Sequence, residues 1–119
     1  MENENMKNDV MVSIVCITYN HRKVIEQAIK GFLKQKTSFK YKIIIHDDCS
    51  TDGTIEVIQK YERKYPDLFD VIYESENMYS KGIDVLDISF SHIEGKYYAI
   101  CEGDDCWIDE NKLQKQVDF

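Results

Sequence analysis

Apolar residues alternate along the chain between short continuous runs and longer stretches with helical spacing. The runs are rich in β-branched residues and lie at 11–17, 41–47, 68–73 and 96–101. The stretches with helical spacing lie between them, at about 24–33, 55–65 and 83–93. Continuous apolar runs are typical of strands buried on both faces, and helical spacing is typical of amphipathic helices. The alternation predicts an α/β fold with a Rossmann-like, mostly parallel sheet flanked by helices.

Residues at the ends of the helical stretches predict where each helix begins and ends. Asn20 is a candidate N-cap of the first helix, and the carboxylate of Asp52 suits the positive end of the second. Tyr65 is expected to continue the buried stripe of that second helix, which Pro66 closes. Gly95 is a candidate C-cap of the third helix.

The pattern predicts one domain. Residues 1–9 are polar and are expected to form a disordered lead-in, and the domain covers 10–119. A last helix is expected from about Asp109, with Leu113 and Val117 facing inward. Its pattern still continues at Phe119, so we expect the domain to be truncated at its C-terminus.

Composition narrows the classes of function. The 119 residues are 43% hydrophobic and carry a net charge of -7, which is typical of a soluble globular protein and argues against nucleic acid as a partner. Acidic proteins that bind phosphate compounds usually recruit a divalent cation. No apolar run approaches the roughly 20 residues of a membrane span, and no signal peptide is evident. We therefore expect a cytoplasmic protein with no transmembrane segment in this part, whose four scattered cysteines are reduced thiols.

Two groups of acidic residues follow the second and fourth predicted strands. The groups are Asp47, Asp48 and Asp52, and Glu102, Asp104, Asp105, Asp109 and Glu110. The carboxyl ends of parallel strands meet at one edge of a sheet, where open α/β sheets bind ligands. Hard divalent cations take carboxylate ligands together with substrate phosphates. The pattern therefore predicts a metal and a diphosphate between the two groups.

Three positions stand out within this predicted edge. Asp48 and Asp105 lie at strand ends, which favours a functional role over helix capping or a solvated rim. Tyr19 follows the first strand and is placed to pack against a nucleobase, with Asp48 accepting a hydrogen bond from a ring N–H of that base. His46 is interpreted as structural, and neither a catalytic Ser-His-Asp arrangement nor a phosphate-binding glycine loop is present in the sequence.

Four motifs in the chain resemble those of family 2 glycosyltransferases of the GT-A fold. They are VSIVCITYN at 12–20, DDCSTDGT at 47–54, EGDD at 102–105, and Trp107 followed by KLQKQV at 112–117. They occur in the family's order on the predicted elements and cover nearly all of the chain from Val10 onward.

This resemblance implies inverting transfer of a sugar from a nucleotide-diphosphate sugar to a hydroxyl of a saccharide or other acceptor, as in polysaccharide biosynthesis. It assigns Thr18, Tyr19, Asn20 and Asp48 to the site that binds the nucleotide sugar. Tyr19 and Asp48 would contact the base.

The resemblance also implies a metal site. Asp105 would coordinate Mg²⁺ or Mn²⁺ as the last acid of a DxD-like motif, and Asp104 would support the ribose or the metal. The family often has asparagine and arginine in the helix before the fourth strand, and residues 83–93 contain neither. The catalytic base of the family lies well beyond the second acidic group, so we expect it beyond Phe119 and expect this chain alone to be inactive.

Three other interpretations stay open at this point. A phosphorelay receiver has a similar length and acids at strand ends, but it needs a lysine after a later strand, and none follows the fourth strand here. A nucleotidyltransferase usually has a glycine-rich basic loop after its first strand, which Thr18–Arg22 lacks. A non-catalytic nucleotide- or sugar-binding fragment is the third.

Overall fold

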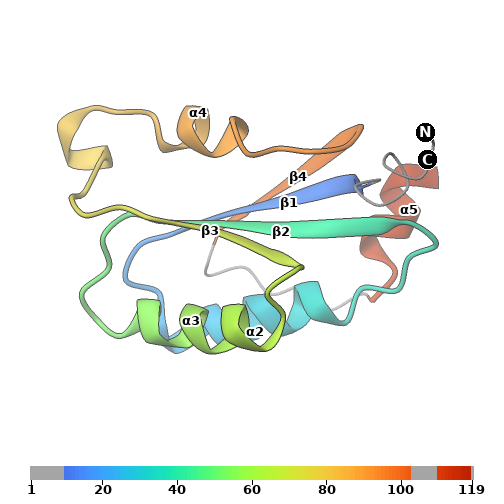
Figure 1. Ribbon diagram of the computed structural model, residues 1–119, viewed down its shortest axis with the longest axis horizontal. Coiled ribbons are helices and arrows are strands. Elements are labelled where there is room, and N and C mark those ends of the chain that lie inside the picture. Colours follow the sequence, from blue (N-terminus) through green and yellow to red (C-terminus); the bar gives the residue numbers. More distant parts are fainter. Residues whose placement is uncertain (1–9, 103–109, 119) are drawn as a thin grey trace.

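The computed structural model describes residues 10–102 and 110–118, and it contains a sheet with helices on both faces (Figure 1). The strands are β1 (Val10–Thr18), β2 (Lys40–Asp47), β3 (Phe69–Tyr73) and β4 (Tyr97–Glu102). The helices are α2 (Arg22–Leu33), α3 (Thr54–Lys64), α4 (Val85–Phe90) and α5 (Lys112–Asp118), with a short 3₁₀ turn η1 (Tyr79–Lys81). The predicted α/β fold is confirmed.

The described strands form one parallel sheet in the order β3-β2-β1-β4. Thr18 of β1 is in register with Asp47 of β2, and Ile17 of β1 is in register with Glu102 of β4. These three strands therefore end at the same edge of the sheet, as predicted.

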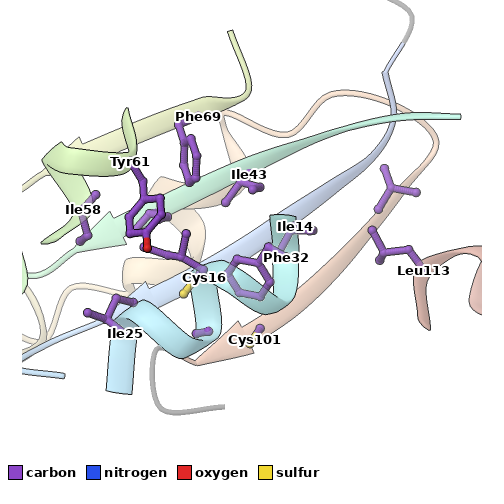
Figure 2. Close-up of a cluster of buried hydrophobic side chains, with 14 residues drawn as sticks. Ile14, Cys16, Ile25, Phe32, Ile43, Ile58, Tyr61, Phe69, Cys101 and Leu113 are labelled. Atoms are coloured by element: carbon purple, nitrogen blue, oxygen red, sulfur yellow. The ribbon is translucent and has the colours of Figure 1, made fainter. Parts of the chain in front are cut away.

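The helices divide into two layers. α2 and α3 cover one face of the sheet, and η1 and α4 lie over the other (Figure 1). A buried apolar cluster joins α2 and α3 to the sheet, with Phe32 of α2 beside Ile14 and Cys16 of β1 (Figure 2). Leu113 of α5 belongs to the same cluster, which confirms the inward position predicted for it.

The helix boundaries on this face differ from the prediction at two residues. Asn20 is not the N-cap of α2, because the helix begins at Arg22 with His21 at the cap position. The amides of His21 and Arg22 donate to Thr54 Oγ1 and Asp52 Oδ2, so the loop after β2 caps α2 from outside. Tyr65 follows the last residue of α3 and is exposed, so the buried stripe of α3 ends at Tyr61.

The helix before β4 is shorter than predicted. α4 spans Val85–Phe90 and not 83–93. Ser13 of β1 donates its hydroxyl to the carbonyl of Glu94 and accepts a hydrogen bond from the Glu94 amide, which ties this segment to the sheet in place of helix. Gly95 is therefore not a C-cap. It lies in the turn before β4, with a φ of 92°.

Candidate functional site

A groove lies at the carboxyl edge of the sheet, on the face that carries η1 and α4. It consists of two adjoining cavities of about 850 and 480 Å³. The residues that line both are Ile17, Tyr19, Tyr79, Ser80 and Val85. We call this feature the Tyr19 groove. Most of its lining is apolar, which is typical of sites for small ligands.

Asp48 lines the Tyr19 groove and holds one of its walls. The residue is 3% exposed, and its carboxylate accepts hydrogen bonds from the amides of Met78 at 2.7 Å and Tyr79 at 3.1 Å. Asn77 donates its side-chain amide to the carbonyl oxygen of Asp48 at 3.1 Å. Each carboxylate oxygen can accept more than one hydrogen bond. Asp48 therefore fixes the loop 77–79 and keeps acceptor capacity toward the groove.

Asp47 has a different task from its neighbour. It is fully buried, and its two carboxylate oxygens accept hydrogen bonds from the amide and the hydroxyl of Ser50, at 2.9 and 2.6 Å. Burial raises the pKa of Asp47, and the two hydrogen bonds from Ser50 oppose that rise. Asp47 holds the turn after β2 and does not line the groove.

Of the three predicted site residues at the end of β1 and directly after it, one lines the groove and two stabilise the surrounding loops. Tyr19 lines the groove and is 47% exposed. Thr18 is fully buried, and its hydroxyl lies 2.9 Å from Nδ1 of His21. Asn20 has a φ of 55° and accepts a hydrogen bond from the Thr51 amide at 2.8 Å. Thr18 and Asn20 thus brace the loops beneath the groove, and their direct contact with a ligand stays a prediction.

His46 is structural, as predicted. It is fully buried on the same face as α4, with Nδ1 2.9 Å from Ser89 Oγ and 3.1 Å from the Val85 carbonyl. Its Nε2 lies 2.9 Å from the carboxylate of Glu74. The imidazole ties β2 to α4 and to the end of β3, and Val85 in turn lines the groove.

The predicted metal ligands Asp104 and Asp105 lie outside the described residues. Within 10–102 and 110–118, no group of three or more His, Cys, Asp or Glu side chains is placed to hold a metal ion. The backbone of Glu102 ends β4 beside Ile17 of β1, so β4 ends at the edge of the sheet that holds the groove.

The loop 77–79 is the part of the site that carries no clear signal in the sequence. Its contact with Asp48 joins residues that are 30 positions apart in the chain, and no periodic pattern of apolar residues indicates this contact. Asn77 accepts a hydrogen bond from the Ser80 amide at 2.7 Å, and asparagine is a residue type common at turns, so Asn77 is a local signal that could have indicated an ordered turn there.

Comparison with known proteins decides the family. The model of glycosyl transferase family 2 matches residues 13–119. The chain belongs to glycosyl transferase family 2. This membership confirms the resemblance in the sequence and decides against a phosphorelay receiver or a nucleotidyltransferase.

Two relatives illustrate how the family 2 chain aligns. It is 44% identical over 110 residues to an uncharacterised protein of Mycobacterium bovis, covering 91% of this chain and 31% of that protein. It is 36% identical over 109 residues to TuaG of Bacillus subtilis, whose name proposes a role as a glycosyltransferase of teichuronic acid biosynthesis. That alignment covers 92% of this chain and 41% of TuaG. The chain thus spans less than half the length of these relatives.

Solved structures share the fold. TarS 1-349 of S. aureus in complex with UDP matches with a TM-score of 0.73 at 25% identity, covering 92% of this chain and 31% of that one. A mannosyltransferase of Pyrobaculum calidifontis in complex with GDP-Man and Mn²⁺ matches with a TM-score of 0.74 at 24% identity, covering 89% and 31%. Within the described parts of this family 2 chain, no helix is both long and apolar enough to cross a bilayer.

Proposed function

We propose that this chain binds the nucleotide-diphosphate sugar donor of an inverting glycosyl transfer, with the base in the Tyr19 groove. The observation that carries the proposal is the position of Asp48, a nearly buried carboxylate that lines the same groove as the exposed ring of Tyr19. An ionised carboxylate only accepts hydrogen bonds, so it is suited to a ring N–H of a nucleobase. An aromatic ring beside it is suited to the face of the base.

The ligands of the structural neighbours support this class of donor. The TarS structures were solved with UDP and with UDP-GlcNAc, and the Pyrobaculum mannosyltransferase with GDP-Man. All three ligands are nucleoside diphosphates or their sugars, and they carry two different bases. We therefore propose a nucleoside diphosphate as the shared part of the ligand, and the titration described below identifies the base.

A divalent metal completes the proposed site. Family membership and the Mn²⁺ in the mannosyltransferase complex support it, and Asp105 with Asp104 would hold Mg²⁺ or Mn²⁺. Carboxylate oxygens fit the preference of both cations. When bound, the cation stabilises charge on the leaving diphosphate.

The residues of this chain contribute binding and orientation. Asp48 and Tyr19 would hold the base, and the braced loops around Thr18 and Asn20 keep both in place. No carboxylate of the described part is assigned the deprotonation of an acceptor hydroxyl, because the family resemblance places that base beyond Phe119. We therefore propose that these 119 residues bind the donor but do not transfer sugar alone.

Calorimetric titration with UDP, GDP, CDP and ADP, each with and without Mn²⁺, tests the proposal. We expect one nucleotide to bind better than the others and to bind more tightly with the metal. Absence of binding for the whole panel contradicts the proposal. Robust sugar transfer by the chain alone contradicts the assignment of the base to a later segment.

A pair of variants tests the metal ligand. Asp105→Asn removes one acid of the DxD-like motif, and Asp109→Asn removes the same charge four residues later, outside that motif. We expect Asp105→Asn to abolish the effect of Mn²⁺ on nucleotide affinity and Asp109→Asn to retain it. An equal effect of the two substitutions contradicts the role of Asp105.

A further inference from the structure

A second exposed tyrosine lies beside Asp48. Tyr79 begins η1, is 79% exposed, and lines both cavities of the Tyr19 groove. Its own backbone amide donates to Asp48 Oδ2 at 3.1 Å. The carboxylate therefore has aromatic residues from two different loops next to it, Tyr19 from the loop after β1 and Tyr79 from the loop after β3.

The loop that carries Tyr79 is held in place by hydrogen bonds on both sides of that residue. Asp48 accepts from the amide of Met78, and Asn77 accepts from the amide of Ser80. The hydroxyl of Ser80 donates to the carbonyl of Asn77 at 2.9 Å. A braced backbone fixes where the ring of Tyr79 emerges, and such preorganisation lowers the entropy lost when a ligand binds.

Planar heterocycles fit this combination of groups. A base presents two aromatic faces and an edge with an N–H donor, and the groove offers two aromatic rings and a carboxylate acceptor. Stacking on aromatic side chains is a general way in which proteins bind bases.

We propose that Tyr79 is a further base-binding residue, whose ring forms the second wall of an aromatic slot for the base, opposite Tyr19 and above Asp48. This inference rests on the proposed function, since it takes the base to lie in the Tyr19 groove. It adds that Asp48 has two tasks, because the same carboxylate that accepts from the base holds the backbone of Tyr79. Base recognition and the position of the second wall are thereby coupled.

The donor sugar is the other group that could pack on Tyr79, because the apolar face of a sugar ring also packs on aromatic rings. Ligands without a donor sugar separate the two possibilities. If the ring of Tyr79 stacks on the base, its removal lowers the affinity for the nucleoside diphosphate and for the nucleotide sugar by the same factor. If the ring packs on the donor sugar, its removal lowers the affinity for the nucleotide sugar alone.

The test is calorimetric titration of the whole chain and its variants with UDP, UDP-GlcNAc, GDP and GDP-Man in the presence of Mn²⁺. Tyr79→Ala is compared with Tyr79→Phe, which keeps the ring. The matched control is Tyr97→Ala, an exposed tyrosine of β4 that does not line the groove. Thermal unfolding verifies that each variant is folded.

We expect Tyr79→Ala to lower the affinity for the preferred nucleoside diphosphate and for the corresponding nucleotide sugar equally, by roughly tenfold. Tyr79→Phe and Tyr97→Ala should bind like the wild type. The inference is overturned if Tyr79→Ala binds both ligands like the wild type, or loses affinity for the nucleotide sugar alone, while the wild type still binds nucleotide. If the wild type binds none of the four ligands, the proposed function fails and the inference fails with it.

Discussion

Asp48 Oδ1 lies 2.7 Å from the backbone nitrogen of Met78, a residue 30 positions later in the chain. This hydrogen bond joins the end of β2 to the loop that follows β3. The loop forms a wall of the Tyr19 groove, so the geometry of that wall depends on one carboxylate. The end of β2 and the loop after β3 lie close together because β3 is the neighbour of β2 in the parallel sheet.

Substitution of Asp48 should reduce both stability and nucleotide affinity. Asp48→Asn replaces one acceptor oxygen with an amide donor that faces a backbone N–H, so we expect the free energy of unfolding to fall by about 2 kcal/mol. Nucleotide affinity should fall at least about tenfold, because the remaining wall loses its anchor. Urea denaturation and calorimetry measure the two effects. Asp67→Asn, an exposed aspartate at the opposite end of the sheet, is the control and should change neither.

Asp47 should make stability depend on pH with a definite sign. Burial raises the folded-state pKa of Asp47 above the ordinary value of 3.8, so its contribution to stability is fully present below that value and is lost as pH rises through the folded-state pKa. Asp47→Asn removes this dependence while keeping an acceptor for Ser50. As pH rises above about 4, the wild type should therefore lose stability relative to Asp47→Asn.

Asp52 provides a comparison of opposite sign for this measurement. Its burial opposes the shift, but hydrogen bonds from Thr54 and from the Arg22 amide lower its pKa below the ordinary value of 3.8. The stability that Asp52 contributes is therefore fully present above about pH 4 and is lost as pH falls below it. In urea denaturation, Asp52→Asn should gain stability relative to the wild type only as pH falls below about 4, whereas Asp47→Asn should gain stability relative to the wild type only as pH rises above it. The same trend in both variants contradicts the assignment for Asp47.

Alanine substitutions at two glycines allow the cost of backbone strain to be measured separately from the cost of a steric clash. Gly82 and Gly95 both have positive φ, but only at Gly95 would a Cβ meet backbone atoms, with the Met11 carbonyl oxygen at 2.6 Å and that of Val10 also in contact. Gly82→Ala should cost about 1 kcal/mol, the price of a left-handed alanine. Gly95→Ala should cost at least about 3 kcal/mol, because β1 must also move. If urea denaturation gave equal losses in the free energy of unfolding for the two variants, the turn before β4 would have to accommodate a Cβ without cost, contrary to this prediction.

Much of the fold follows from the apolar runs, because a strand buried on both faces must be apolar throughout. The run at 43–45 predicts β2, and its abrupt end at Asp47 predicts the edge where the groove lies. The short α4 could not be predicted in the same way. The segment after it is held to the sheet by the Ser13 hydroxyl, whose hydrogen bonds to Glu94 depend on tertiary structure and leave no periodic pattern in the sequence.

The site shows the same division. Tyr19 and Asp48 could be placed at one edge, because each directly follows a predicted strand and parallel strands end together. The hydrogen bonds between Asp48 and the loop 77–79 could not be predicted. They join a strand end to a polar loop through backbone amides, and backbone amides give no residue-specific signal in the sequence. The capping of α2 by Asp52 and Thr54 was missed for a related reason, since sequence patterns describe caps supplied locally.

Binding of nucleotide in the Tyr19 groove can be tested by mapping shift changes on the amides of the 119-residue chain by ¹⁵N–¹H NMR. With UDP or GDP and Mg²⁺, we expect the largest shift changes at Tyr19, Asp48, Met78 and Tyr79. A second cavity of about 840 Å³ lies at the opposite end of the sheet beside Lys42 and Asp70 and serves as an internal alternative. Shift changes centred there, with the amides around Asp48 unaffected, would contradict the claim that the Tyr19 groove binds the nucleotide.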